Sequence, residues 1–322
     1  MSLITERTWP SSFADRLTTP TPRLRDIFKI LRTGGFARRD LSDASRIPVA
    51  KADELPSVAT GQTGVTWIGH ATYVLQIGGL RVLTDPVWSS KIPGTPARLT
   101  PPGVPMEAVP HVDAVVISHN HYDHLDAPTI RRLPRDTPVF VPGGLGRWFR
   151  RRGFTAVTEM DWWESVSYRG VDIGFVPAHH WSRRGLMDTC RTLWGGWVLS
   201  NSDAKVYFAG DTGYGHWFAE IATRHPDVDL ALLPVGAYEP RWFMKPVHMN
   251  PADAVQACLD LGAPRMAAMH WGTFALSREP LLAPLQESVA AWLQAGRPRE
   301  DLWTLAPGET KVLPARVTRS AQ

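Results

Sequence analysis

Short apolar runs alternate with polar turns from Val65 onward, and this pattern predicts a succession of strands and helices. The runs 73–77 and 80–84 flank Gly78-Gly79, which is typical of a tight hairpin because glycine accepts the backbone angles of a two-residue turn. Further strands are predicted at 113–118, 138–141, 171–177, 195–200, 205–209, 230–233 and 265–269, and helices at 127–132, 145–152, 216–225, 250–262 and 281–295. Hairpins followed by mixed strand and helix units predict an α/β layered domain with more than one sheet.

Residues 1–60 differ from the rest of the chain because they are rich in proline, threonine and arginine. We treat them as an N-terminal extension to a main domain of residues 61–322. Within the extension, Leu24, Ile27, Phe28 and Leu31 recur at helical spacing, with basic residues between them. This stretch is either a helix packed on the main domain or a basic amphipathic helix lying on a membrane surface.

Composition narrows the class of protein. The 322 residues are 43% hydrophobic and 20% charged, which is enough to build a large core. The longest apolar runs, such as 114–117 and 230–233, fall far short of the roughly 18 residues needed to span a bilayer. The N-terminus lacks the order of a secretion signal, and the two cysteines, Cys190 and Cys258, form no CxxC pattern. We therefore expect a cytoplasmic protein with reduced thiols, or one peripheral to the inner face of the membrane.

Charge and motif content exclude several function classes. The net charge of +4 is too small to indicate a polyanionic partner, and the arginines at 147 and 150–152 are typical of a solvated helix face. We therefore expect no nucleic-acid partner. The chain also lacks a G-x-S-x-G elbow, a GxxxxGK phosphate loop and a dinucleotide fingerprint. The 14 tryptophans indicate apolar clefts or interfaces instead.

The strongest chemical signal is the run Ser118-His119-Asn120-His121-Tyr122-Asp123-His124, which follows a predicted buried strand. Three imidazoles and a carboxylate in six residues, placed where a strand becomes a loop, can converge on cations. More candidate ligands follow later strands in the same way: His179-His180, Asp211 and His270. This shared placement favours one site at the strand ends.

The order H-x-H-x-D-H, then His, Asp and His, resembles the metallo-β-lactamase-fold hydrolases over residues 61–312. The closer resemblance is to the branch that contains N-acylphosphatidylethanolamine-hydrolysing phospholipase D. It rests on the segments 67–72, 83–86, 177–181, 208–213, 238–244 and 269–274, of which Tyr238-Glu239-Pro240-Arg241-Trp242-Phe243-Met244 is the most specific. The resemblance implies an α/β fold, the αβ/βα four-layer sandwich, with two mixed sheets face to face, helices outside and the site at one edge. It also implies a homodimer.

The resemblance further implies two zinc ions, or similar divalent cations, per chain. It assigns His119, His121 and His180 to one ion, Asp123, His124 and His270 to the other, and Asp211 to both. His180 is preferred to His179 because the family pattern has histidine directly before Trp181, although the strand pattern leaves the choice open. His70 and Asp85 would either support the ligands from beneath or form a buried structural pair.

The implied activity is that of a dinuclear phosphodiesterase of phospholipase D type acting on N-acyl phospholipids. Asp123, Asp211 and His248 are the candidate catalytic residues, with His248 either a proton donor or an ordinary loop histidine. Aromatic residues near the site loops, Trp181, Tyr238, Trp242 and Phe243 among them, would line an acyl cleft or belong to the core. Alternatives are a lactonase or nuclease of the same fold, and a non-catalytic membrane-associated binding protein.

Overall fold

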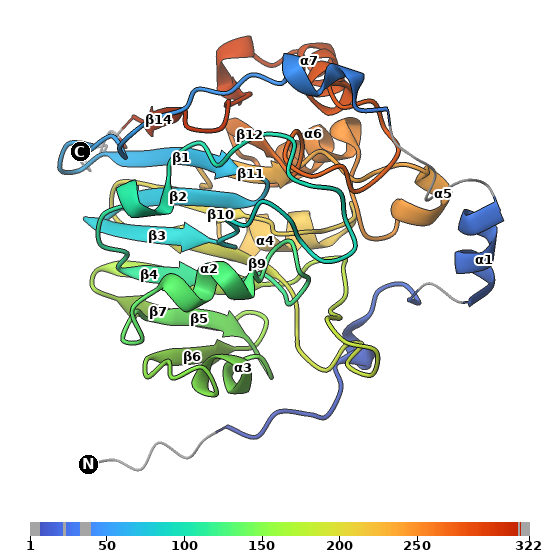
Figure 1. Cartoon of the computed structure of the whole chain (residues 1–322). Helices are drawn as coiled ribbons and strands as arrows, with labels where there is room; N and C mark the ends of the chain where they lie inside the picture. The colour runs from blue at the N-terminus through green and yellow to red at the C-terminus, as the bar shows by residue number, and fades with distance from the viewer. Residues whose placement is uncertain (1–6, 22–23, 33–39, 315, 317–322) are drawn as a thin grey trace.

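The computed structural model describes residues 7–21, 24–32, 40–314 and 316, and in these residues two seven-stranded mixed sheets pack face to face (Figure 1). The first sheet has the order β14 (Thr310–Leu313), β1 (Thr63–Gly69), β2 (Thr72–Ile77), β3 (Leu80–Thr84), β4 (Ala114–Val116), β5 (Val139–Pro142) and β6 (Val157–Met160). It is antiparallel from β14 to β3 and parallel from β3 to β6.

The second sheet repeats this division. Its order is β13 (Leu302–Trp303), β12 (Arg265–Met269), β11 (Leu230–Pro234), β10 (Lys205–Phe208), β9 (Gly196–Ser200), β8 (Val171–Val176) and β7 (Ser165–Tyr168). Strands β10 to β13 are parallel, and β7 to β10 are antiparallel. Because β8 and β10 both run antiparallel to β9, the strands β8, β10, β11 and β12 all point the same way.

Helices flank the two sheets (Figure 1). They are α2 (Ala127–Arg132), α3 (Gly146–Arg150), α4 (Trp217–Arg224), α5 (Arg241–Met244), α6 (Pro251–Asp260) and α7 (Ala283–Gln294), with α1 (Leu24–Arg32) in the extension. Helix α6 contacts β11, β12, α4 and α7. It begins as the sequence predicts: the Asn250 side chain accepts the Asp253 N–H, and the Asp253 side chain accepts the Asn250 N–H. Short 3₁₀ helices occupy Ala14–Arg16, Ser42–Arg46, Met106–Ala108 and Arg299–Asp301.

The predicted α/β sandwich is therefore confirmed, and its strands are apolar on both faces for a visible reason. On β2, Tyr73 and Leu75 pack into the core between the sheets, whereas Val74 packs into an outer cluster with residues near α2 and α3. On β4, Val116 faces the inner core and Val115 the outer one. A strand covered on both sides reads as a continuous apolar run rather than an alternating one.

Five of the described strands and one α-helix were not predicted, nor were the short 3₁₀ helices. Strands β6 and β7 are only partly buried, and β13 has two residues, so each carries a weak hydrophobic pattern. Strand β14 pairs with β1 at the far end of the first sheet. Strand β1 is buried throughout, but its glycines and threonines obscure its apolar positions. Helix α5 has four residues, which is too short to show a helical period.

The described part of the N-terminal extension is partly packed on the main domain. Phe13 is buried and its N–H donates to the Cys190 carbonyl. In α1, Phe28 is 66% exposed, and the Lys29 ammonium lies 4.1 Å from the centre of the Trp242 ring. The side chains of the other predicted apolar positions, Leu24, Ile27 and Leu31, lie outside the described ones. Among the described residues, no helix has the length and hydropathy to traverse a bilayer, and both cysteines are buried and unpaired.

Candidate metal centre

The candidate ligands lie at strand ends on one edge of the sandwich. The run 118–124 follows β4, His180 follows β8, Asp211 follows β10 and His270 follows β12. Since these strands deliver their carboxyl ends to a common edge, side chains more than 150 residues apart in sequence meet there. The donor atoms of these side chains lie close to one another, at the distances given below.

One cluster contains His119, His121, His180 and Asp211, whose donor atoms all lie within 4.8 Å of one another. Nδ1 of His121 is 2.9 Å from Nε2 of His119 and 3.3 Å from Nε2 of His180. Oδ2 of Asp211 is 3.9 Å and 3.8 Å from those same Nε2 atoms. Three imidazole nitrogens and one carboxylate oxygen therefore face a common point.

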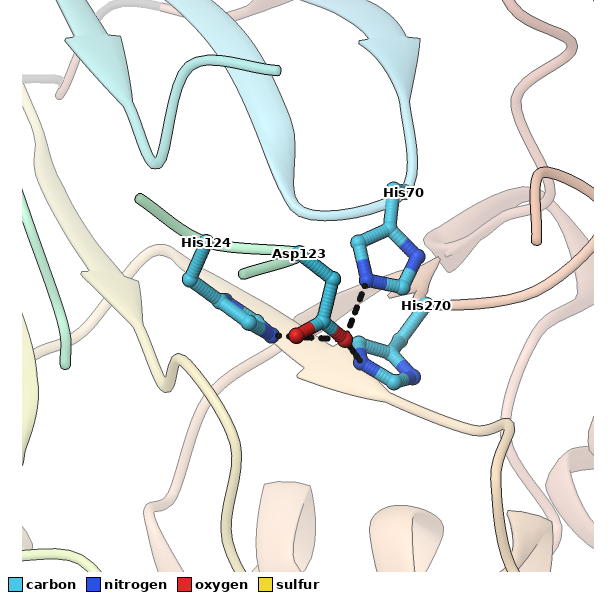
Figure 2. A group of neighbouring side chains, drawn as sticks. All are labelled: His70, Asp123, His124 and His270. Atoms are coloured by element: carbon cyan, nitrogen blue, oxygen red, sulfur yellow. Dashed lines mark hydrogen bonds and ion pairs between the residues drawn. The ribbon is translucent and has the colours of Figure 1, made fainter. Parts of the chain in front are cut away.

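A second cluster contains His70, Asp123, His124 and His270, again with donor atoms within 4.8 Å. Figure 2 shows the Asp123 carboxylate between the three rings. Its Oδ2 is 3.1 Å from Nε2 of His70 and 3.6 Å from Nε2 of both other histidines. The sequence predicts that His70 either supports the site from beneath or forms a buried structural pair with Asp85. The structure places its Nε2 directly against a candidate ligand and among the donor atoms.

Asp211 lies between the two clusters. Its Oδ1 is 3.1 Å from Nε2 of His270, and its Oδ2 is 3.2 Å from Nε2 of His124 while also facing the first cluster. A carboxylate in this position can contact two cations at once, as the resemblance implies for this residue.

Unsatisfied buried atoms in the structure indicate that these side chains can bind metal ions. Nε2 of His124, Nε2 of His270 and Oδ1 of Asp211 are buried and make no hydrogen bond. Buried polar atoms are almost always satisfied, so a convergent group of unsatisfied nitrogen and oxygen atoms indicates a ligand that bonds to them. Imidazole and carboxylate are the ligands that zinc and similar divalent cations accept.

Burial and mutual charge place His119, His121, His180 and Asp211 in their ligating forms, whereas His124 and His270 hold a proton. Burial lowers the pKa of His119 and His180 well below the usual value and that of His121 to about 4, so all three rings are neutral at pH 7. Burial acts to raise the pKa of Asp211, but His124 and His270 outweigh it and hold the carboxylate ionised. Burial likewise acts to lower the pKa of His270, and there Asp211 and Asp123 outweigh it, raising the pKa to about 9. A cation would displace this proton.

Asp85 lies beneath the centre and orients two ligands. Its Oδ2 is 2.7 Å from Nδ1 of His124, and its carboxylate accepts both the Ser118 N–H and the Ser118 hydroxyl. Oγ of Ser118 is in turn 2.9 Å from Nδ1 of His119. Because Nδ1 of each histidine is engaged outside the site, Nε2 is presented to it.

The structure also separates the two adjacent histidines. His180 lies in the first cluster and its Nδ1 is 3.0 Å from the Val247 carbonyl oxygen. The His179 ring turns away, with Nδ1 2.7 Å from Oγ1 of Thr18 and the ring centre 5.2 Å from that of His216. The position nearer Trp181 is therefore the one that reaches the centre.

His248 lies at the margin of the centre. Its Nδ1 is 4.0 Å from Oδ2 of Asp211, and this nitrogen is buried without a hydrogen-bond partner. Its carbonyl accepts from Nη1 of Arg241 at 3.0 Å, and Nη2 of Arg241 pairs with Asp253 at the start of α6. Sequence reasoning named Arg241 only as part of the segment 238–244 and gave it no role, since only three-dimensional proximity reveals these contacts.

The four aromatic residues predicted to bind substrate occupy different environments. Trp181 packs edge-on against His121, with ring centres 5.1 Å apart, and lines a cavity of about 520 Å³ that His121 also lines. Tyr238 is 4% exposed and its hydroxyl donates to Glu287. Trp242 is half-exposed beside Lys29, and Phe243 packs against Trp242. Of the four, only Trp181 lines this cavity.

Comparison with known proteins agrees with this architecture. Residues 80–271 match the β-lactamase superfamily domain. The chain is 41% identical over 262 residues to an uncharacterised protein of Mycobacterium tuberculosis, covering 77% of this chain and 68% of that one. It is 37% identical over 306 residues to N-acyl-phosphatidylethanolamine-hydrolyzing phospholipase D 1 of Caenorhabditis elegans, covering 87% and 84%.

A solved structure supports the fold alone. The isothiocyanate hydrolase from Delia radicum gut bacteria superposes with a TM-score of 0.63 at 22% identity, over 79% of this chain and all of that one. The site and fold together define a metal-dependent hydrolase. The chain belongs to the metallo-β-lactamase superfamily, in the branch that contains N-acyl-phosphatidylethanolamine-hydrolysing phospholipase D.

Proposed function

We propose that the protein is a dinuclear zinc phosphodiesterase of phospholipase D type that acts on N-acyl phospholipids. The observation that carries this proposal is the pair of donor clusters joined by Asp211. Its substrate class rests on the relationship to the worm enzyme, which extends over most of both chains. When bound, two adjacent cations would activate a water molecule and neutralise charge on the phosphoryl group.

The side chains of this protein would supply the geometry and the proton. His119, His121 and His180 would hold one cation, and Asp123, His124 and His270 the other, with Asp211 between them. His248, whose Nδ1 is buried beside Asp211 without a hydrogen-bond partner, has a pKa that burial lowers to about 4, so its neutral ring would donate its N–H proton to the departing alkoxide or a hydrogen bond to a phosphoryl oxygen. The chain would not need to supply a side-chain nucleophile.

Exposed apolar side chains support a lipid substrate at a membrane surface. The cavity beside His121 is also lined by Leu186, which is 86% exposed, and the next residue, Met187, is 81% exposed. Phe28 on α1 adds a third exposed apolar side chain. We infer that the adjacent residues Leu186 and Met187, the first of which lines this cavity, enter the membrane interface together with Phe28.

Metal analysis and a substrate panel test the proposal. We expect about two zinc ions per chain, loss of activity on chelation and recovery on adding zinc. With N-acyl phospholipids of increasing acyl length kept below aggregation, kcat/KM should rise, because each buried methylene contributes about 0.8 kcal/mol. A small chromogenic phosphodiester, a lactone and a β-lactam serve as comparisons. Equal kcat/KM across acyl lengths, or preference for the lactone, would overturn the substrate assignment.

Vesicle sedimentation tests the membrane contact separately. Phe28→Ser combined with Leu186→Ser and Met187→Ser should weaken binding to vesicles containing anionic phospholipid, and added salt should weaken binding of the unmodified protein. Leu41→Ser and Val312→Ser, at two exposed apolar positions elsewhere, form the matched control. No vesicle binding by the unmodified protein would exclude a membrane role for these side chains.

A further inference from the structure

Arg184 reaches from the loop after β8 to the loop that carries four of the candidate metal ligands. Its Nη1 lies 2.6 Å from the carbonyl oxygen of Leu125 and 3.2 Å from that of Asn120. The same nitrogen is 3.5 Å from the carbonyl oxygen of His121. One guanidinium therefore contacts the backbone of this loop at its beginning and at its end.

Two aromatic rings lie close to this guanidinium. It lies 4.1 Å from the centre of the Tyr122 ring and 5.7 Å from that of Trp148 on α3. Arginine combines a planar, permanently charged fork of donors with a stacking surface, which lysine cannot reproduce. The contact with Tyr122 adds a side chain to the backbone contacts with the same loop.

Arg184 is itself held by a closed turn. The Asp188 carboxylate accepts the N–H groups of Arg184 and Gly185, at 3.1 Å and 2.7 Å. The N–H of Cys190 donates to the Ser182 carbonyl, which joins the two ends of the same loop. The exposed residues Leu186 and Met187 form the tip of this turn. Arg184 therefore projects from an anchored base and not from a free loop.

We propose that Arg184 is a positioning residue that holds loop 119–124 in the conformation in which its histidines and Asp123 can bind metal. It contacts the carbonyl groups that flank the ligands and does not reach the donor atoms. Without it, the loop would retain its ligands but sample conformations in which they do not converge, so metal affinity would fall. The consequence for catalysis rests on the proposed function, whereas the effect on the loop does not.

Hydrogen exchange and metal competition test this role. In the metal-free protein, Arg184→Ala should increase amide exchange in residues 119–126. In chelator competition it should weaken zinc binding by about 10- to 100-fold, the usual scale for a residue that supports ligands without binding metal. Arg184→Lys should fall between Arg184→Ala and the unmodified protein, because an ammonium offers a point charge without the planar fork.

Arg152→Ala is the matched control. The Arg152 guanidinium stacks on the same Trp148 ring at 3.6 Å, and its Nη1 donates to the Trp148 carbonyl, without contacting the metal loop. It should leave exchange at 119–126 and zinc affinity unchanged. If Arg184→Ala does not fold, Asp188→Ala replaces it, since it loosens the turn and keeps the guanidinium.

The outcomes separate this inference from the proposed function. Unchanged exchange and zinc affinity in a folded Arg184→Ala or Asp188→Ala protein would overturn the role of Arg184. The same would hold if Arg152→Ala had an equal effect. Failure of the unmodified protein to hydrolyse any phosphodiester would remove the proposed substrate while leaving the exchange and metal measurements valid.

Discussion

Two loops reach the metal centre from different sheets, and they contribute to it in different ways. The first, residues 118–124, follows β4 and carries four candidate ligands in seven residues. The second, residues 235–248, follows β11 and brings one polar side chain, His248, to the centre. The first loop is therefore a dense set of donors, and most of the second loop is structural support.

The contacts of the second loop show what that support consists of. The Glu279 carboxylate accepts the N–H groups of Ala237 and Glu239, and the Tyr238 hydroxyl donates to Glu287. Arg241 joins the His248 carbonyl to Asp253. The contacts of segment 238–244, on which the resemblance to the family branch chiefly rests, thus fix the path of the chain to His248. The aromatic segment 238–244 therefore makes structural contacts, whereas the candidate ligands lie in the polar segment 118–124.

Asp211→Asn should have the largest effect, because Asp211 faces both clusters. An amide keeps the shape but removes the charge that two cations would share, so metal content and turnover should both be lost. Metal analysis after gel filtration and a phosphodiesterase assay measure this. Full metal content together with unchanged turnover would show that Asp211 does not join the clusters.

His248→Ala should come next and should differ in kind, since His248 was proposed as a proton donor and not as a ligand. We expect both metals to be retained and kcat to fall about 10²- to 10⁴-fold. The loss should shrink for a nitrophenyl phosphodiester, whose leaving group needs no proton. Loss of metal would make His248 a ligand, and unchanged kcat on an alkyl ester would remove it from the mechanism.

Asp85→Asn tests whether the carboxylate beneath the first loop orients its ligands. An amide leaves a donor facing the Ser118 N–H or Nδ1 of His124, so we expect metal affinity to fall about 10- to 100-fold. Asp113→Asn is the matched control. Asp113 is a buried carboxylate just before β4, at the opposite end from the metal loop, and it accepts the Arg81 N–H. Both variants should lose about 1–3 kcal/mol of unfolding free energy, but only Asp85→Asn should release metal.

The two loops also differ in how much of their role the sequence predicts. The run 118–124 is recognisable because its donors are adjacent and follow an apolar strand. The contacts of Arg184 and Arg241 are not recognisable in this way, since each side chain donates to backbone carbonyl groups that no residue type reveals. The contact between Arg184 and Leu125 also joins residues 59 apart.

The strands of the fold also differ in how well the sequence predicts them. Runs such as 230–233 and 265–269 are buried on both faces and were predicted as strands. Strands β6 and β7 are half-exposed and were not predicted. The hydrophobic pattern of the sequence therefore predicts which strands are buried. It does not predict the long-range polar contacts that orient the side chains of a site.

Arg241→Ala should have the smallest effect, because it acts on the centre only through the carbonyl of His248. We expect metal content to be unchanged and kcat to fall about tenfold or less, on the lower side of what removing His248 itself costs. Lys245→Ala, which removes an exposed cation one residue beyond α5, should leave kcat unchanged.

A double-mutant cycle then decides the mechanism. If Arg241 acts by positioning His248, Arg241→Ala should cost nothing further in a His248→Ala background, and its cost should shrink for the nitrophenyl ester as that of His248→Ala does. Additive losses in the double variant would instead mean that Arg241 supports the site by another route, and the second loop would then contribute more than one functional residue.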